Sequence, residues 1–101
     1  DDCQRELTIL VDQLAARVER ARAGNMIHKT YVKLRFADFR GTTVECVYPQ
    51  VALPVFAKLL AQGFERRRIP VRLLGVGVRL HETDAHARQQ TLFSEDADPA
   101  R

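Results

Sequence analysis

The sequence has no tryptophan, only two cysteines, and no apolar run long enough for a membrane-spanning helix, which needs about 20 residues. The cysteines, Cys3 and Cys46, stand far apart and show no zinc-ligand spacing, so we interpret both as small buried apolar residues. The first residues, DDCQRE, do not resemble a signal or transit peptide. Nothing indicates secretion, and we expect a protein of the reducing cytoplasm with no membrane partner.

Acidic residues are scarce in the middle of the chain. From Arg17 to Arg79 there are 13 Lys or Arg and only 4 Asp or Glu, a net charge of +9, whereas the segment on either side carries −3. A basic middle between acidic ends favours a surface that binds a polyanion such as nucleic acid. The alternative is a solvated surface of mixed charge.

A chain of 101 residues predicts one domain. Residues 3–22 are predicted to form a helix, because apolar residues recur every three or four positions and Gly24 and Asn25 supply a stop signal. The apolar stripe of this helix consists of Cys3, Leu7, Leu10, Val11, Leu14 and Val18.

Two strands are predicted next. Residues 28–36 (HKTYVKLRF) alternate apolar and polar and indicate a half-buried strand with a cationic opposite face. After a turn at ADFRG, residues 42–48 (TTVECVY) are rich in β-branched side chains and predict the antiparallel partner. The buried face of the second strand stays open, because either Val44 and Cys46 or Val47 could point inward.

A second helix and a third strand complete the pattern. Pro49 ends the second strand, and Pro54 suits the first turn of a helix that ends in three arginines before Pro70. Residues 71–80 (VRLLGVGVRL) then alternate as a strand, and the polar residues 81–101 predict a flexible tail. The apolar stripe of the helix is expected to be Phe56, Leu59, Leu60, Gly63 and Phe64.

These segments predict an α+β domain over residues 1–80, in the order helix, strand, strand, helix, strand. Each helix has one apolar stripe and the strands have one apolar face. We therefore expect one mainly antiparallel sheet with both helices packed on the same face. The other face would be exposed.

No catalytic or metal centre is predicted. The GVG of the third strand lacks the third glycine and the following helix of a dinucleotide-binding loop. His81, Glu82, Asp84 and His86 lie in the expected tail without a framework for a metal, so we interpret them as solvated. The few acids of the basic middle are scattered, whereas two-metal chemistry needs clustered carboxylates.

The exposed sheet face is the first candidate binding site. Lys33 and Arg35 are two apart on one strand and point the same way, and Arg79 belongs to the matching face of another strand. Such a face can follow phosphates without reading bases. Gly75 and Gly77 would leave a patch without side chains beside Arg79, where a phosphate backbone could approach.

The second candidate is the tail segment RQQTLF. Leu92 and Phe93 form an isolated apolar pair in a charged segment with no core to join. Such a pair can anchor in the pocket of a partner, although it can also arise by chance.

The motifs YVKLRFADFRGTT and VRLLGVGVRL, in this order and spacing, resemble the little finger domain of Y-family DNA polymerases, most closely the bacterial DNA polymerase IV type. The resemblance covers nearly the whole chain. Polymerases of this type end in a motif similar to Gln-Leu-x-Leu-Phe that docks on the sliding clamp. Gln89, Leu92 and Phe93 match that motif, and Gln90 stands where the family prefers leucine.

The resemblance implies an accessory domain of an error-prone, translesion DNA-directed DNA polymerase. The domain would bind primer–template duplex DNA without sequence preference and tether to the sliding clamp (beta subunit) through its C-terminal peptide. Lys33, Arg35, Thr43 and Arg79 would stand at positions similar to the phosphate contacts of the family. The catalytic carboxylates and their magnesium belong to a palm domain, so this chain is expected to hold no cofactor and to be inactive alone.

Little finger domains begin with a strand before the first helix, in the order β-α-β-β-α-β, whereas this chain starts at the helix. We expect that strand to have been trimmed or to be supplied by another chain, and an open strand position would invite self-association. Two other functions stay open. One is a protein–protein interaction domain with an incidentally basic sheet; the other is an RNA-binding sheet, which is disfavoured because Tyr31 alone would offer a stacking surface.

Overall fold

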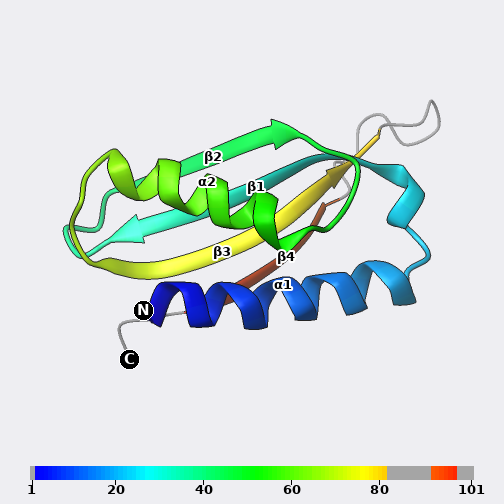
Figure 1. The fold of residues 1–101 in the computed structure, drawn as a ribbon, viewed down its shortest axis with the longest axis horizontal. Coiled ribbons are helices and arrows are strands. Elements are labelled where there is room, and N and C mark those ends of the chain that lie inside the picture. The colour runs from blue at the N-terminus through cyan, green and yellow to red at the C-terminus, as the bar shows by residue number, and fades with distance from the viewer. Residues whose placement is uncertain (1, 82–91, 98–101) are drawn as a thin grey trace.

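The computed structural model describes residues 2–81 and 92–97. Figure 1 shows two layers, a twisted sheet and two helices that lie on one of its faces. The elements in chain order are α1 (Asp2–Arg20), the 3-10 turn η1 (Gly24–Met26), β1 (Ile27–Phe36), β2 (Gly41–Val47), α2 (Leu53–Glu65), β3 (Val71–Leu80) and β4 (Leu92–Ala97).

The sheet is antiparallel throughout, with the strand order β2-β1-β3-β4. Helix α1 packs over β3 and β4, and α2 packs over β1 and β2 (Figure 1). The predicted α+β class, the element order up to Leu80 and the placement of both helices on one face are confirmed.

The core lies between the helices and the sheet. The register pairs Val32 with Val44 and with Val76, so their side chains share the helix face and all three are buried. This pairing settles the face that the sequence left open: Val44 and Cys46 point inward, whereas Val47 is 67% exposed on the opposite face. The predicted stripe of α1 is also buried, apart from a partly buried Cys3.

Both helices are followed by an arginine in the left-handed region, not by a glycine. Arg22 has φ 55°, and the amides of Arg22 and Ala23 donate back to the carbonyls of Glu19 and Val18, which is a Schellman motif. The helix predicted to reach residue 22 therefore stops at Arg20. Arg68, with φ 54°, follows α2 in a similar way, and its amide donates a hydrogen bond to the Phe64 carbonyl.

Helix α2 packs closely on β1 because of Gly63. A Cβ at Gly63 would collide with the side chain of Leu34, which is fully buried in β1. The predicted stripe of Phe56, Leu59, Leu60 and Gly63 is buried, but Phe64 is 38% exposed and lies beside Cys3 at the rim of the helix layer.

The predicted flexible tail is wrong for residues 92–97. These residues form β4, which pairs with β3 from Arg79 to Leu74, and the Glu95 carboxylate lies 3.7 Å from Arg17 of α1. The edge of the sheet beside β3 is thus occupied by β4 in this structure. Self-association through an open strand position stays a prediction. The sequence did not reveal β4 because the stability of an edge strand depends on pairing with its neighbour more than on its own apolar pattern.

Candidate nucleic-acid interface

The sheet face opposite the helices, here called the outer sheet face, is the candidate interface. Because side chains alternate along a strand, every second residue of β1, β2 and β3 lies on this face. The strand register arranges these residues in rows that cross the sheet. The residues of interest are Lys29, Tyr31, Lys33, Arg35, Thr43, Glu45, Gly75, Gly77 and Arg79.

Lys33 and Arg35 supply positive charge to the outer sheet face. Both side chains are exposed, and no ion pair involves either of them in the described part of the chain. Lys33 stands between Thr43 on β2 and Gly75 on β3, and Arg35 lies two residues, or about 7 Å, further along β1. The predicted residues Lys33, Arg35 and Thr43 therefore come together on one surface.

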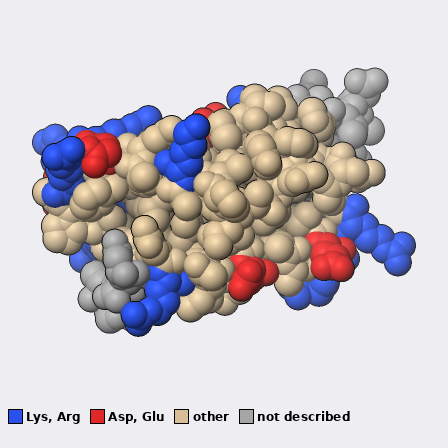
Figure 2. Space-filling model, viewed as in Figure 1, with Lys and Arg blue, Asp and Glu red and all other residues tan. Residues whose placement is uncertain are grey.

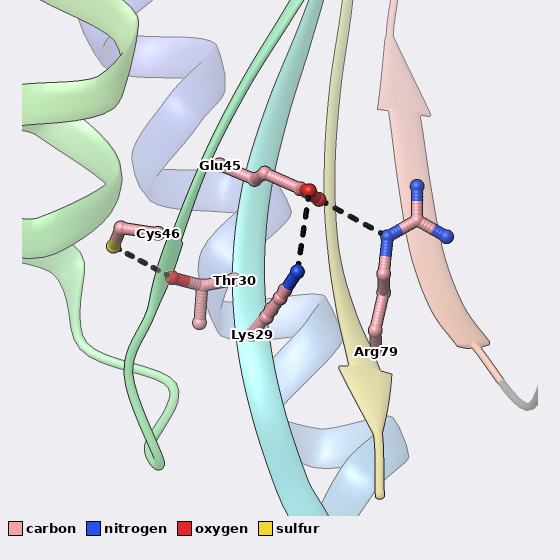
Figure 3. A network of polar contacts seen from close by, with 5 residues as sticks. All are labelled: Lys29, Thr30, Glu45, Cys46 and Arg79. Atoms are coloured by element: carbon pink, nitrogen blue, oxygen red, sulfur yellow. Dashed lines mark hydrogen bonds and ion pairs between the residues drawn. The ribbon is translucent and has the colours of Figure 1, made fainter. Parts of the chain in front are cut away.

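The carboxylate of Glu45 binds the other two cations of the outer sheet face (Figure 3). The Nζ atom of Lys29 is 3.7 Å from its Oε1, and the Nε of Arg79 donates to its Oε2 at 3.1 Å. These side chains are 36% to 38% exposed, so water screens the pairs and each contributes at most about 1 kcal/mol. Arg79 is thus on the expected face, but an acid already neutralises it.

Gly77 does not leave the bare patch expected from the sequence. Tyr31 stands opposite Gly77 on β1, and a Cβ on the glycine would collide with the tyrosine ring and hydroxyl. The guanidinium of Arg79 lies over the same ring, 5.2 Å from its centroid. The Tyr31 ring covers Gly77, so close approach of a phosphate backbone does not explain this glycine. For Gly75, which is buried and stands opposite Lys33, close approach stays a prediction. Gly77 makes room for the ring that supports Arg79.

The predicted clamp-binding residues are only partly covered by the structure. Gln89 lies outside the described residues. Leu92 and Phe93 open β4, where their backbones pair with Arg79 and Val78 of β3. The described end of the segment predicted to dock on a partner therefore lies in the strand beside β3.

The structure also bears on the interpretations that the sequence set aside. Strand β3 runs through both glycines of GVG, which excludes a nucleotide loop there. His81 stacks on His28 with ring centroids 4.6 Å apart, whereas Glu82, Asp84 and His86 lie outside the described residues. Within residues 2–81 and 92–97, no three metal-ligating side chains gather, and no helix is long and apolar enough to cross a membrane.

Sequence reasoning placed Tyr31 on the open face but did not single out Lys29 or the contact of Glu45 with Arg79. Lys29 follows the same alternation as Lys33, so the period of two along β1 could have identified it. Glu45 follows the same alternation as Thr43. Its contact with Arg79 depends on β1 lying between their two strands, which no local pattern reveals.

Comparison with known proteins identifies the family. Residues 1–92 match the impB/mucB/samB family C-terminal domain. The chain belongs to this family. The impB/mucB/samB C-terminal domain described here is 90% identical over 99 residues to DNA polymerase IV of Ralstonia nicotianae, and 41% identical over 88 residues to DNA polymerase IV of Legionella pneumophila. These matches cover 98% and 87% of this chain.

A solved structure supports the same assignment. The impB/mucB/samB C-terminal domain superposes, with a TM-score of 0.74 and 28% sequence identity, on one chain of a complex of the beta-clamp processivity factor and the little finger domain of PolIV. The alignment covers 81% of this domain and 76% of the matched chain. The resemblance to a Y-family little finger domain of the DNA polymerase IV type is thereby confirmed. The chain spans about a quarter of the length of these polymerase relatives.

Proposed function

We propose that this domain holds duplex DNA for a translesion polymerase by contacting the phosphate backbone with its outer sheet face. The observation that carries the proposal is the exposed pair Lys33 and Arg35, which form no ion pair in the described part of the chain; Lys33 stands directly opposite Thr43. Cations in such an array neutralise phosphates and release counterions, without reading sequence. Membership of a family whose relatives are DNA polymerases supports this partner.

The test is fluorescence anisotropy with a labelled primer–template duplex between 50 and 200 mM salt. We expect Lys33→Ala and Arg35→Ala to weaken binding for all duplex sequences and to reduce the salt slope by about 1 each. Lys58→Ala is the matched control, because Lys58 is exposed on α2 in the helix layer. Equal affinities for the three variants would refute the proposal. Absence of DNA binding at physiological salt would favour the protein-interaction domain instead.

We propose further that the segment containing Gln89, Leu92 and Phe93 tethers the domain to a sliding clamp. Support comes from the solved neighbour, a little finger domain in complex with a beta clamp. Replacing Leu92 and Phe93 by alanine should abolish binding to a purified sliding clamp while leaving duplex affinity unchanged. Arg88→Ala serves as the control next to the motif, and clamp binding that survives the double replacement would contradict the tether.

The parent enzyme is proposed to be a DNA-directed DNA polymerase that uses magnesium in a separate palm domain. The chain spans about a quarter of the length of its DNA polymerase IV relatives. Nucleotide incorporation should require the longer polymerase, which a primer-extension assay on this chain and on the longer polymerase would check.

A further inference from the structure

Arginines gather at the end of the molecule where β1 turns into β2 and where α2 ends (Figures 1 and 2). Two carboxylates of this end, Asp38 and Glu65, already form ion pairs with Arg67 and Arg68. The remaining arginines have no carboxylate partner within the described residues. We call this surface the arginine end, and its cations are Arg40, Arg66, Arg67, Arg68 and Arg72.

An exposed aromatic ring stands among these arginines. Phe39, in the turn between β1 and β2, is 62% exposed and has φ 67°, a conformation that a bulky side chain rarely adopts. The turn is held by hydrogen bonds from the Phe39 amide to the Phe36 carbonyl and from the Arg40 amide to Asp38. A three-residue hairpin loop of this kind places its last residue in the left-handed region, where glycine is usual. Because the Phe39 ring is exposed, core packing does not account for a bulky side chain at this position.

A break in strand register turns Arg72 toward the same ring. The pairs Arg35–Leu73 and Phe36–Val71 leave Arg72 without a partner on β1, so it occupies a β-bulge. Regular alternation would place Arg72 on the helix face with Leu74, but bulges redirect side chains. The Arg72 side chain is exposed, and its guanidinium lies 4.5 Å from the centre of the Phe39 ring.

We propose that the arginine end binds single-stranded DNA by stacking a base on the Phe39–Arg72 pair. Two irregular backbone positions, the left-handed Phe39 and the bulge at Arg72, together present a solvent-exposed ring beside a guanidinium. Single-stranded DNA is bound by this combination of an aromatic platform and surrounding cations. In a duplex the bases are already stacked on one another, so the platform is selective for an unpaired strand.

The position of Arg35 connects this site to the duplex surface. Arg35 lies on the outer sheet face, pairs with Gly41 and Leu73, and is the last residue of that face on β1 before the turn. A strand leaving a duplex on the outer sheet face therefore passes Arg35 before it reaches Phe39. The test of this site is independent of the proposed duplex contact, because it uses single-stranded DNA as the probe and replaces Phe39 and Arg72.

The test uses a fluorescein-labelled dT12 oligonucleotide and a blunt duplex of the same length. Phe39→Asn removes the ring while keeping the turn, because asparagine tolerates the left-handed region. We expect this variant to bind dT12 about tenfold more weakly and the duplex with unchanged affinity, since one base stack corresponds to a loss of about that size. Arg72→Ala should weaken dT12 binding, whereas Arg20→Ala, which removes an exposed arginine at the end of α1, should not.

A second measurement reports stacking directly. The chain has no tryptophan, so Phe39→Trp introduces a single indole fluorophore whose emission dT12 should quench and the blunt duplex should not. Unchanged dT12 affinity in Phe39→Asn, or an equal loss for dT12 and duplex, would overturn the proposal. The same conclusion would follow if dT12 bound the Phe39→Trp variant without quenching its emission.

Discussion

Glu45 is expected to compete with DNA phosphates for the cations of the outer sheet face. Its carboxylate holds Lys29 at 3.7 Å and Arg79 at 3.1 Å, so a phosphate that binds these cations must displace it. Glu45→Gln keeps the shape of the side chain and removes its charge. The variant should therefore bind duplex DNA more tightly than the original chain.

The size of this effect follows from the two ion pairs. Exposed pairs contribute about 0.2–1 kcal/mol each, so displacing both costs a phosphate backbone about 0.4–2 kcal/mol. Removing that cost corresponds to an affinity about two- to thirtyfold higher. If both cations then neutralise a phosphate, the slope of log affinity against log salt should steepen by about 2.

The assay is anisotropy of a labelled duplex over a salt series, with urea unfolding to verify that both variants are folded. Glu19→Gln is the matched control, because it removes the same charge from an exposed position on α1, in the helix layer. Glu45→Gln must exceed this control in both affinity and salt slope. Equal gains for the two variants would mean that only net charge matters, and would refute a phosphate contact at Lys29 and Arg79.

Three further predictions concern the scaffold and are measured by unfolding. Gly77→Ala should lower the free energy of unfolding in urea by about 1–3 kcal/mol, because the new methyl group collides with the Tyr31 ring. This loss should be smaller in a Tyr31→Ala background, and an equal loss with and without the ring would contradict the collision. Arg22→Gly should raise this free energy by about 1 kcal/mol, because glycine adopts φ 55° without strain, whereas Arg20→Gly, at the last helical residue of α1, should lower it. Partial desolvation raises the pKa of Asp38, but the hydrogen bond from the Arg40 amide and the charge of Arg67 outweigh it and hold the pKa below its usual value. The ionised carboxylate therefore stabilises the fold above the unfolded pKa of about 4, and this contribution is lost as pH falls through the folded pKa. Asp38→Asn should be less stable than the original chain at pH 7, and this difference should shrink as pH falls below about 4; a difference in thermal unfolding that stays constant as pH falls would rule this out.

The outer sheet face shows how far reasoning from the sequence reaches. Alternation along β1 correctly placed Lys33 and Arg35 on an exposed face, because the period of two is a local property of a strand. Alternation along β3 placed Gly77 on that face, but it could not show that Tyr31 covers the glycine from the neighbouring strand. The contact of Glu45 with Arg79 was equally hidden, because their strands are not adjacent in the sheet.

The sequence by itself determined the order of the elements up to Leu80, most of the buried stripe of each helix and the basic character of one sheet face. These properties are periodic and depend on residues a few positions apart, so they can be counted along the chain. Only the tertiary structure decided that residues 92–97 join the sheet, that Glu45 neutralises two of the cations, and that a bulge turns Arg72 onto Phe39. Each of these depends on strand pairing or register between segments distant in the sequence, and a shift of one residue would send the side chains to the other face.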